Sequence, residues 1–113
     1  MATAVFRHQG AAIDHAPAAD VAAGDVVVQG ELVGVARLDI KANTLGALAV
    51  EGVFDFPKAV GASTALTTGT DVFWDAAALE ATSNAATGAN KKIGRVVRDA
   101  VDADALVRIR MSQ

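Results

Sequence analysis

The sequence predicts a small, mainly β protein, folded as an antiparallel β-barrel or sandwich with at most one or two short helical turns. Apolar residues recur with a period of two, typical of strands, far more often than with the helical period of about 3.6. Turn-forming residues separate the apolar runs at intervals of about 8–15 residues, a spacing that indicates antiparallel strands. A chain of 113 residues is long enough for one β domain, residues 1–113, and too short for two.

The N-terminal half contains the clearest hairpin and the longest alternating run. Residues 25–29 and 32–36 are rich in valine and flank a short glycine-containing connection, which predicts a β-hairpin. In residues 46–56, large and small or polar side chains alternate, which predicts one long, half-buried strand. Gly52 within it indicates a bulge or a close backbone approach. Pro57 ends this strand because proline has no N–H group to donate.

The C-terminal half continues the same pattern with shorter strands. Residues 71–74 and 93–97 predict two of them, and residues 107–111 predict a final strand whose apolar side chains alternate with two arginines. Residues 75–81 contain good helix formers after a capping aspartate, which predicts a helix of barely two turns. Residues 98–105 are equally rich in alanine but contain three aspartates, which suits a turn as well as a helix.

The composition predicts a modest hydrophobic core. Hydrophobic residues make up 52% of the chain, but 26 of them are alanine and only 33 are larger. Aromatic residues account for 4% of the chain. A domain of this size buries about 65% of its unfolded surface. Because few large side chains are available for that burial, we expect neighbouring subunits to contribute to its stability.

The charge balance and the absence of cysteine exclude several classes of protein. A formal net charge of −3 with 20% charged residues is typical neither of a basic nucleic-acid binder nor of a disordered chain. No apolar run approaches the ~18 residues of a membrane-spanning helix. Charged and polar residues from Arg7 onward interrupt any apolar core of a signal peptide, so we expect synthesis in the cytosol. Without cysteine there are no disulfides and no thiol chemistry.

No catalytic, cofactor-binding or metal-binding constellation stands out in the sequence. His8 and His15 lie near acidic residues, but their spacing fits no common set of metal ligands, so we interpret them as partly exposed histidines. No serine occupies a G-x-S-x-G turn, and no phosphate-binding P-loop motif occurs. Arg108 and Arg110 are interpreted as a solvated face of the last strand, or as partners of acids across an interface, rather than as part of a nucleic-acid site. The basic residues that cluster late in the chain are Lys91, Lys92, Arg95, Arg98, Arg108 and Arg110.

Several segments resemble those of a family of small tailed-phage and prophage proteins, the capsid decoration or cement proteins. The most specific are the run G-V-F-D-F-P-K at residues 52–58 and the step F-W-D at residues 73–75, and the resemblance covers nearly the whole chain. The sequence departs from the family pattern at His15, where an aromatic residue is common, and at Asn43, where glycine is common. Asparagine tolerates the left-handed conformation, so the turn at Asn43 is expected to persist.

The resemblance implies a non-enzymatic structural protein of the virion. It implies a mainly β homotrimer that is made in the host cytoplasm, binds the major capsid protein on the outside of the expanded capsid and stabilises it, as the lambda head decoration protein does. No cofactor, metal, membrane, nucleic acid or small-molecule substrate is expected. Residues 1–9 are a possible capsid-contacting arm. The candidate contacts with the capsid or a neighbouring subunit are Ala2, Thr3, Ala4, Val5, Phe6, Arg7, Pro57, Lys58 and Trp74.

Other interpretations of the same residues remain open. Trp74, together with Phe54 and Phe56, is most simply a core residue, and Lys58 after Pro57 is equally well a solvated residue at a strand end. Some members of the family have been labelled RecA-like recombinases, so the alternative function is a nucleic-acid-associated phage recombination factor. A third possibility is a small β enzyme or ligand-binding barrel with an unrecognised pocket.

Overall fold

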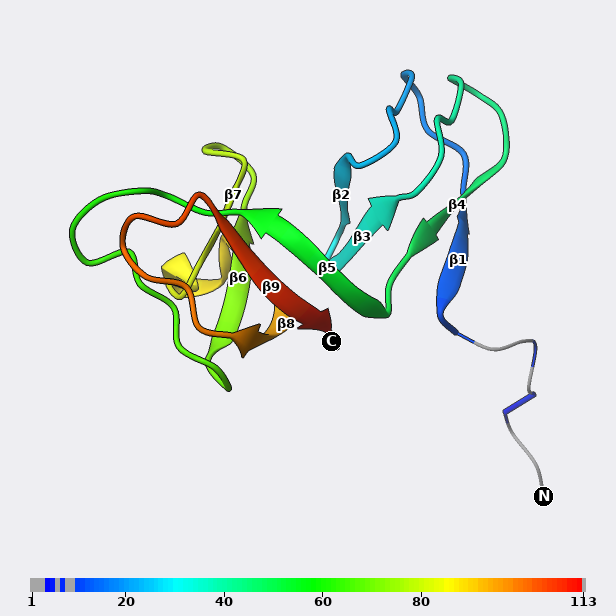
Figure 1. Cartoon of the computed structure of the whole chain (residues 1–113). Helices are drawn as coiled ribbons and strands as arrows, with labels where there is room; N and C mark the ends of the chain where they lie inside the picture. Colours follow the sequence, from blue (N-terminus) through cyan, green and yellow to red (C-terminus); the bar gives the residue numbers. More distant parts are fainter. Residues whose placement is uncertain (1–3, 6, 8–9, 113) are drawn as a thin grey trace.

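Two antiparallel sheets make up the protein, and they lie side by side (Figure 1). The structure is a computed structural model that describes residues 4–5, 7 and 10–112. Apart from one 3₁₀ turn, η1 (Ala86–Gly88), no helix occurs in the described residues, so the predicted mainly β class is confirmed. The strands are β1 (Ala12–His15), β2 (Val26–Gln29), β3 (Leu32–Ala36), β4 (Gly46–Ala49), β5 (Gly52–Pro57), β6 (Asp71–Asp75), β7 (Glu80–Thr82), β8 (Lys91–Arg98) and β9 (Leu106–Met111).

The first sheet has four strands in the order β1-β4-β3-β2. The predicted hairpin is confirmed, because β2 pairs with β3 from Val26 opposite Val35 to Gln29 opposite Leu32. Gly30 begins the two-residue turn with a φ of +60°, a conformation that glycine adopts without strain. The first sheet therefore has β1 and β2 as its two edges.

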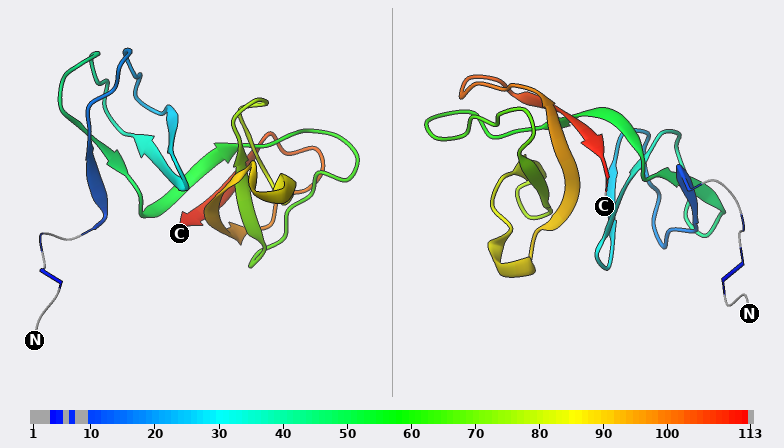
Figure 2. Two further views of the ribbon diagram at one scale, coloured as in Figure 1. Left: turned by 180° about the vertical axis from the view of Figure 1, so that it is seen from behind. Right: turned by 90° about the horizontal axis from the view of Figure 1, so that it is seen from below.

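The second sheet has five strands in the order β5-β9-β8-β6-β7. β9 lies between β5 and β8 and pairs with β5 along its whole length, from Gly52 opposite Met111 to Pro57 opposite Leu106. An isolated parallel bridge between Lys58 and Ala81 brings the two edges of this curled sheet together at one point. No continuous ladder joins those edges, so the fold is sandwich-like rather than a closed barrel (Figure 2).

The long strand predicted over residues 46–56 is in fact two strands in different sheets. β4 ends at Ala49 and β5 begins at Gly52, which has a φ of +126°. That backbone conformation is open to glycine and turns the chain from one sheet to the other. The alternation of large with small or polar residues continues through residues 46–56 of the sequence, so periodicity alone does not reveal the break.

The helix predicted over residues 75–81 is wrong, because residues 76–79 form the tight turn between β6 and β7 and the rest of the segment belongs to these two strands. Asp75 does act as a cap, and its Oδ1 accepts hydrogen bonds from the backbone N–H groups of Ala77 and Ala78 at 3.1 and 3.2 Å. Leu79 then takes a φ of +57°, which stops any helix. β7 follows at once, and its pairing with β6 outweighs the helix propensity of three alanines.

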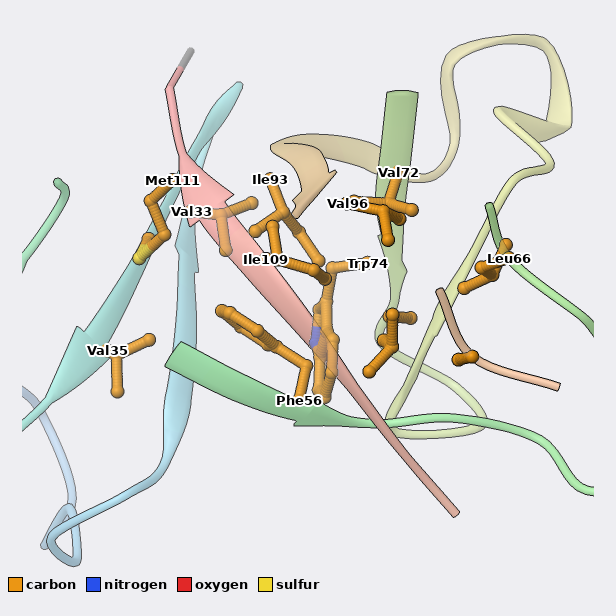
Figure 3. Close-up of a cluster of buried hydrophobic side chains, with 13 residues drawn as sticks. Val33, Val35, Phe56, Leu66, Val72, Trp74, Ile93, Val96, Ile109 and Met111 are labelled. Atoms are coloured by element: carbon orange, nitrogen blue, oxygen red, sulfur yellow. The ribbon is translucent and has the colours of Figure 1, made fainter. Parts of the chain in front are cut away.

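One main cluster of buried side chains holds the two sheets together (Figure 3). Phe56 and Trp74 meet edge to face with their ring centroids 6.1 Å apart in the second sheet. Val33 and Val35 of β3 pack into the same cluster, so the first sheet shares the core of the second. Among the described alanines only four are buried, which places most of the alanine outside the core.

β8 and β9 approach each other so closely at Gly94 that a side chain has no space there. A Cβ atom built on Gly94 would lie 2.0 Å from the carbonyl oxygen of Arg110. We expect Gly94→Ala to lower the free energy of unfolding by at least about 3 kcal/mol, because the strands must separate to admit the methyl group. Urea unfolding followed by circular dichroism measures this loss. Gly10→Ala is the control, since nothing lies within 4 Å of its Cβ position, and equal stability of the two variants would contradict the prediction.

Candidate functional site

Titratable side chains are dispersed over the surface rather than gathered in a catalytic or metal-binding cluster. Within residues 4–5, 7 and 10–112, no group of three histidine, cysteine, aspartate or glutamate side chains is placed to hold a metal ion. His15 lies in β1, and its Nδ1 accepts a hydrogen bond from the side-chain amide of Gln29, whereas His8 lies outside the described residues. In the same part of the chain, no helix has the length and hydrophobicity needed to cross a bilayer. The candidate functional sites are therefore regions of the surface.

The predicted N-terminal arm falls partly within the structure. Ala4, Val5 and Arg7 are exposed, and 73% of Val5 is accessible. The predicted contacts Ala2, Thr3 and Phe6 lie outside the described residues. Val5 is thus an exposed apolar side chain ahead of the edge strand β1.

The other three predicted contacts lie in the second sheet, away from the arm (Figure 1). Pro57 is exposed at the end of β5. Lys58 and Trp74 are only 5% and 4% exposed, and Trp74 packs in the main core as its simplest interpretation had it. Burial disfavours direct contact of Lys58 and Trp74 with a partner, so their contact role stays a prediction.

Lys58 is buried at the end of β5, where its ammonium group donates hydrogen bonds to the loop that follows. Its Nζ donates hydrogen bonds to the carbonyl oxygen of Ala59 at 2.6 Å and to Oγ1 of Thr64 at 3.1 Å. Thr64 in turn donates from Oγ1 to the carbonyl oxygen of Gly61 at 2.6 Å. A buried cation that donates to several oxygens is partly compensated for its lost hydration, so Lys58 acts as a structural residue here.

Two long loops, residues 58–70 and 99–105, run side by side and form a unit that we call the paired loops (Figure 2). Leu66 and Ala100 exchange two backbone hydrogen bonds of 2.9 and 2.8 Å. Oδ1 of Asp102 accepts from the backbone N–H groups of Thr64 at 3.0 Å and Ala65 at 2.8 Å. These bonds hold the loop backbones in one arrangement, although neither loop contains a long strand.

A second aspartate fixes the other end of the paired loops. Oδ1 of Asp99 accepts hydrogen bonds of 2.7 Å from both the backbone N–H and the hydroxyl of Thr68. These two bonds, the backbone one first, hold the pKa of the Asp99 carboxyl below its usual value. Val60 and Val101 are 61% and 59% exposed on the same unit. The paired loops thus present exposed apolar side chains on a backbone that is already ordered.

The outward face of the second sheet carries most of the basic residues from the end of the chain. Arg95 lies opposite Arg110 and Arg98 lies opposite Arg108 in the ladder of β8 with β9. We call the face that these four residues share the arginine face. Asp55 on β5 stands opposite Arg108 and accepts from its Nε at 2.9 Å and its Nη2 at 3.3 Å. The sequence prediction of a charged outer face on the last strand is confirmed.

The ion pair of Asp55 with Arg108 shifts the titration of both groups. The hydrogen bond from Arg108 lowers the pKa of the Asp55 carboxyl, and the same bond raises the pKa of the Arg108 guanidinium. Both side chains are nearly half exposed, so solvent screens the pair and it contributes little to stability. The pair fixes the position of Arg108 on the arginine face.

Comparison with known proteins matches most of this chain to one family. A family model described as phage cement protein matches residues 7–111, a segment that contains every strand from β1 to β9. No curated protein and no solved structure matches the chain.

Removal of the Asp102 carboxylate tests the order of the paired loops. We expect Asp102→Ala to lower the free energy of unfolding by about 1–2 kcal/mol, since two backbone N–H groups lose their acceptor. Hydrogen exchange at Thr64 and Ala65 should become faster, whereas Asp102→Asn, which keeps Oδ1, should change it little. Protection unchanged in Asp102→Ala would show that the loops are ordered by other contacts.

The ion pair on the arginine face predicts a small dependence of stability on pH. Because the folded-state pKa of Asp55 is lowered, its contribution is present at neutral pH and is lost as the pH falls below about 4. Asp55→Asn should therefore be less stable than the wild type at pH 7, and the difference should shrink as the pH falls below about 4. Thermal unfolding across this range measures the difference, with Glu80→Gln as the control. A constant difference at all pH values would contradict the assignment.

Proposed function

Because the chain belongs to the phage cement protein family, we propose that it binds the outer surface of the expanded capsid as a homotrimer and stabilises the shell. The family has a structural, capsid-associated role, and it is not a class of enzymes. The match over residues 7–111 is the single observation that carries the proposal. We also propose that residues 1–113 act as one domain, which the shared core around Val33 and Val35 supports.

The proposed mechanism is physical, because a cement protein bridges subunits that would otherwise separate. A trimer seated where several major-capsid subunits meet contacts several of them at once. Each contact can be weak, since the later contacts form at high effective concentration once the first is made. Separation of the capsid subunits then requires those contacts to break as well, which raises the free energy needed to rupture the shell.

The N-terminal arm, residues 1–9, is proposed as one capsid contact. An extended segment can add to the exposed edge of a sheet in a partner through backbone hydrogen bonds, with side chains giving specificity. The exposed side chains of Ala4 and Val5 support this mode, because they leave apolar groups available to the partner. The arm precedes β1, an edge strand of the first sheet, so it can extend away from the body of the molecule.

The ordered tip of the paired loops is proposed as a second contact. Val60 and Val101 are exposed on it, and Pro57 is exposed at its base. Burial of such side chains in an interface removes apolar surface from water at a gain of about 25 cal/mol per Å². Because hydrogen bonds already hold the loops, little conformational entropy is lost when they bind.

Co-sedimentation with purified phage heads tests the proposed function. The protein should pellet with expanded heads and not with unexpanded heads of the cognate phage, and it should raise the temperature at which expanded heads rupture. Absence of binding to the expanded shell would overturn the proposal. Salt-sensitive binding to DNA instead would support the alternative function, a nucleic-acid-associated recombination factor.

Deletion of residues 2–9 tests the role of the arm. We expect the deletion to weaken binding to expanded heads by about tenfold or more, because the strand addition and the apolar contact of Val5 are lost. Val5→Asp should weaken binding in the same direction. Leu79→Asp introduces the same charge at a residue that is 64% exposed on the turn between β6 and β7, and it should bind as the wild type does. Unchanged binding of the deletion variant would exclude the arm as a contact.

A further inference from the structure

The arginine face is positively charged although the whole chain is acidic. Its strands carry five outward cations, the four arginines and Lys92, whose Nζ lies 3.7 Å from Asp71. Two carboxylates on the same strands, Asp55 and Asp71, leave these strands a net charge of +3, and two loop carboxylates, Asp99 and Asp104, line a hollow beside Arg98 and Arg108. The formal charge of the chain is −3, so the remaining five basic and eleven acidic residues sum to −6.

Like charges face each other across the strands of the arginine face. In the pair Arg95–Arg110, only Arg95 has an ion pair, with Asp71 at 3.0 Å. In the pair Arg98–Arg108, only Arg108 has one, with Asp55. Within the part of the chain that the structure describes, Arg98 and Arg110 have no carboxylate within ion-pair distance, although Arg98 lies near enough to Asp55 to help lower the pKa of its carboxyl. Like charges opposite each other destabilise a sheet, and an acidic partner surface would relieve this repulsion.

The arginine face also exposes apolar side chains that suit a protein partner. Val53 lies opposite Arg110 and is 56% exposed, and Leu106 on β9 is 55% exposed. No aromatic side chain in the described residues is among the exposed ones, so bases of a nucleic acid would find no stacking platform. Mixed cationic and apolar character favours a protein surface that is both acidic and apolar.

The first sheet has a surface of that complementary kind. Val35 of β3 packs in the main core, and Ala49 of β4 stands directly opposite it. The same face continues without cover over β4 and β1, where Ala47 is exposed. There it forms a groove of about 580 Å³ that we call the alanine groove. The small side chains of its lining are Ala11, Ala12, Gly46, Ala47 and Ala49.

The surroundings of the alanine groove are acidic. Asp39 and Glu51 contribute to its lining together with one cation, Arg37, and Asp14 stands opposite Ala47 beside it. Residues 10–51 contain six carboxylates and only two cations, which gives this half of the molecule a formal charge of −4. Leu38 and Leu45 add exposed apolar surface at the rim.

We propose that the arginine face of one copy binds the alanine groove of a neighbouring copy, so that three copies close into a ring. This inference rests on the proposed function, which includes the trimer. The contact is between two different surfaces, as rotational symmetry of order three requires. The two surfaces adjoin on each copy at Glu51, which lines the alanine groove and also a hollow shared with Arg110. Complementary surfaces that adjoin favour a tight closed ring, whereas surfaces on opposite sides would favour an open filament.

Charge reversal across the contact tests the proposal. The full chain should form trimers in light scattering coupled to size-exclusion chromatography, and high salt should weaken them because it screens the ionic contacts. Arg110→Glu and Asp14→Arg should each raise the dissociation constant about tenfold or more, and the double variant should restore most of the affinity. Lys41→Glu is the control, since it reverses a cation that lies outside both surfaces. Arg110→Gln removes the positive charge without reversing it, and circular dichroism shows whether each variant is still folded.

The possible results distinguish failure of this contact between copies from failure of the proposed capsid role. Weakened single variants and a restored double variant support the contact. A trimer that none of the substitutions changes, or a chain that stays monomeric at 100 µM (a concentration of about 10⁻⁴ M, well above a specific oligomer's dissociation constant), would overturn it. Normal trimers of Arg110→Glu that bind heads or DNA poorly would assign the arginine face to the capsid or to nucleic acid instead, and would also overturn it. Head binding by a monomer would leave the capsid role standing while this contact fails.

Discussion

The packing of β3 against the second sheet is the constraint on which the rest of the structure depends. Val33 and Val35 are buried residues of the first sheet that join the main core, where they meet Phe56 and the buried side chains of β8 and β9, and the partly buried Val26 of β2 packs against the same cluster. The first sheet has a second cluster of its own, but its fully or nearly buried members are only Ala36, Ile40 and Leu48. So small a cluster offers little apolar burial, so the first sheet depends on the core of the second. The positions of the paired loops, the arginine face and the alanine groove relative to one another follow from this junction.

The abundant alanine has a consistent place in this structure. Few of the alanines are buried, and several line the uncovered face of β1 and β4. A sheet face of small side chains is flat and lets another backbone approach closely, but it buries little area within its own subunit. That neighbouring subunits contribute to the stability of the fold stays a prediction. In the proposed assembly, a capsid and sister copies supply the missing burial.

The sequence predicted correctly the elements that depend on residues close together in the chain. The hairpin of β2 and β3 and the strands β8 and β9 follow from alternating apolar residues and a turn at Gly30. The break before Gly52 is hidden because alternation continues through it, and β1 is hidden because its four residues include a single large apolar side chain, Ile13. The burial of Lys58 and the order of the paired loops depend on residues far apart in the chain, such as Thr64 and Asp102. Sequence periodicity carries no information about such pairings. The arm stays a prediction, since it is proposed from its position and composition.

A cryo-electron microscopy reconstruction of expanded heads incubated with the protein tests the central claim most directly. The account requires density for the two-sheet body on the outside of the shell, at positions where several capsid subunits meet, with the N-terminal residues in contact with a capsid subunit. Expanded heads that show no added density outside the shell in the presence of excess protein would contradict it.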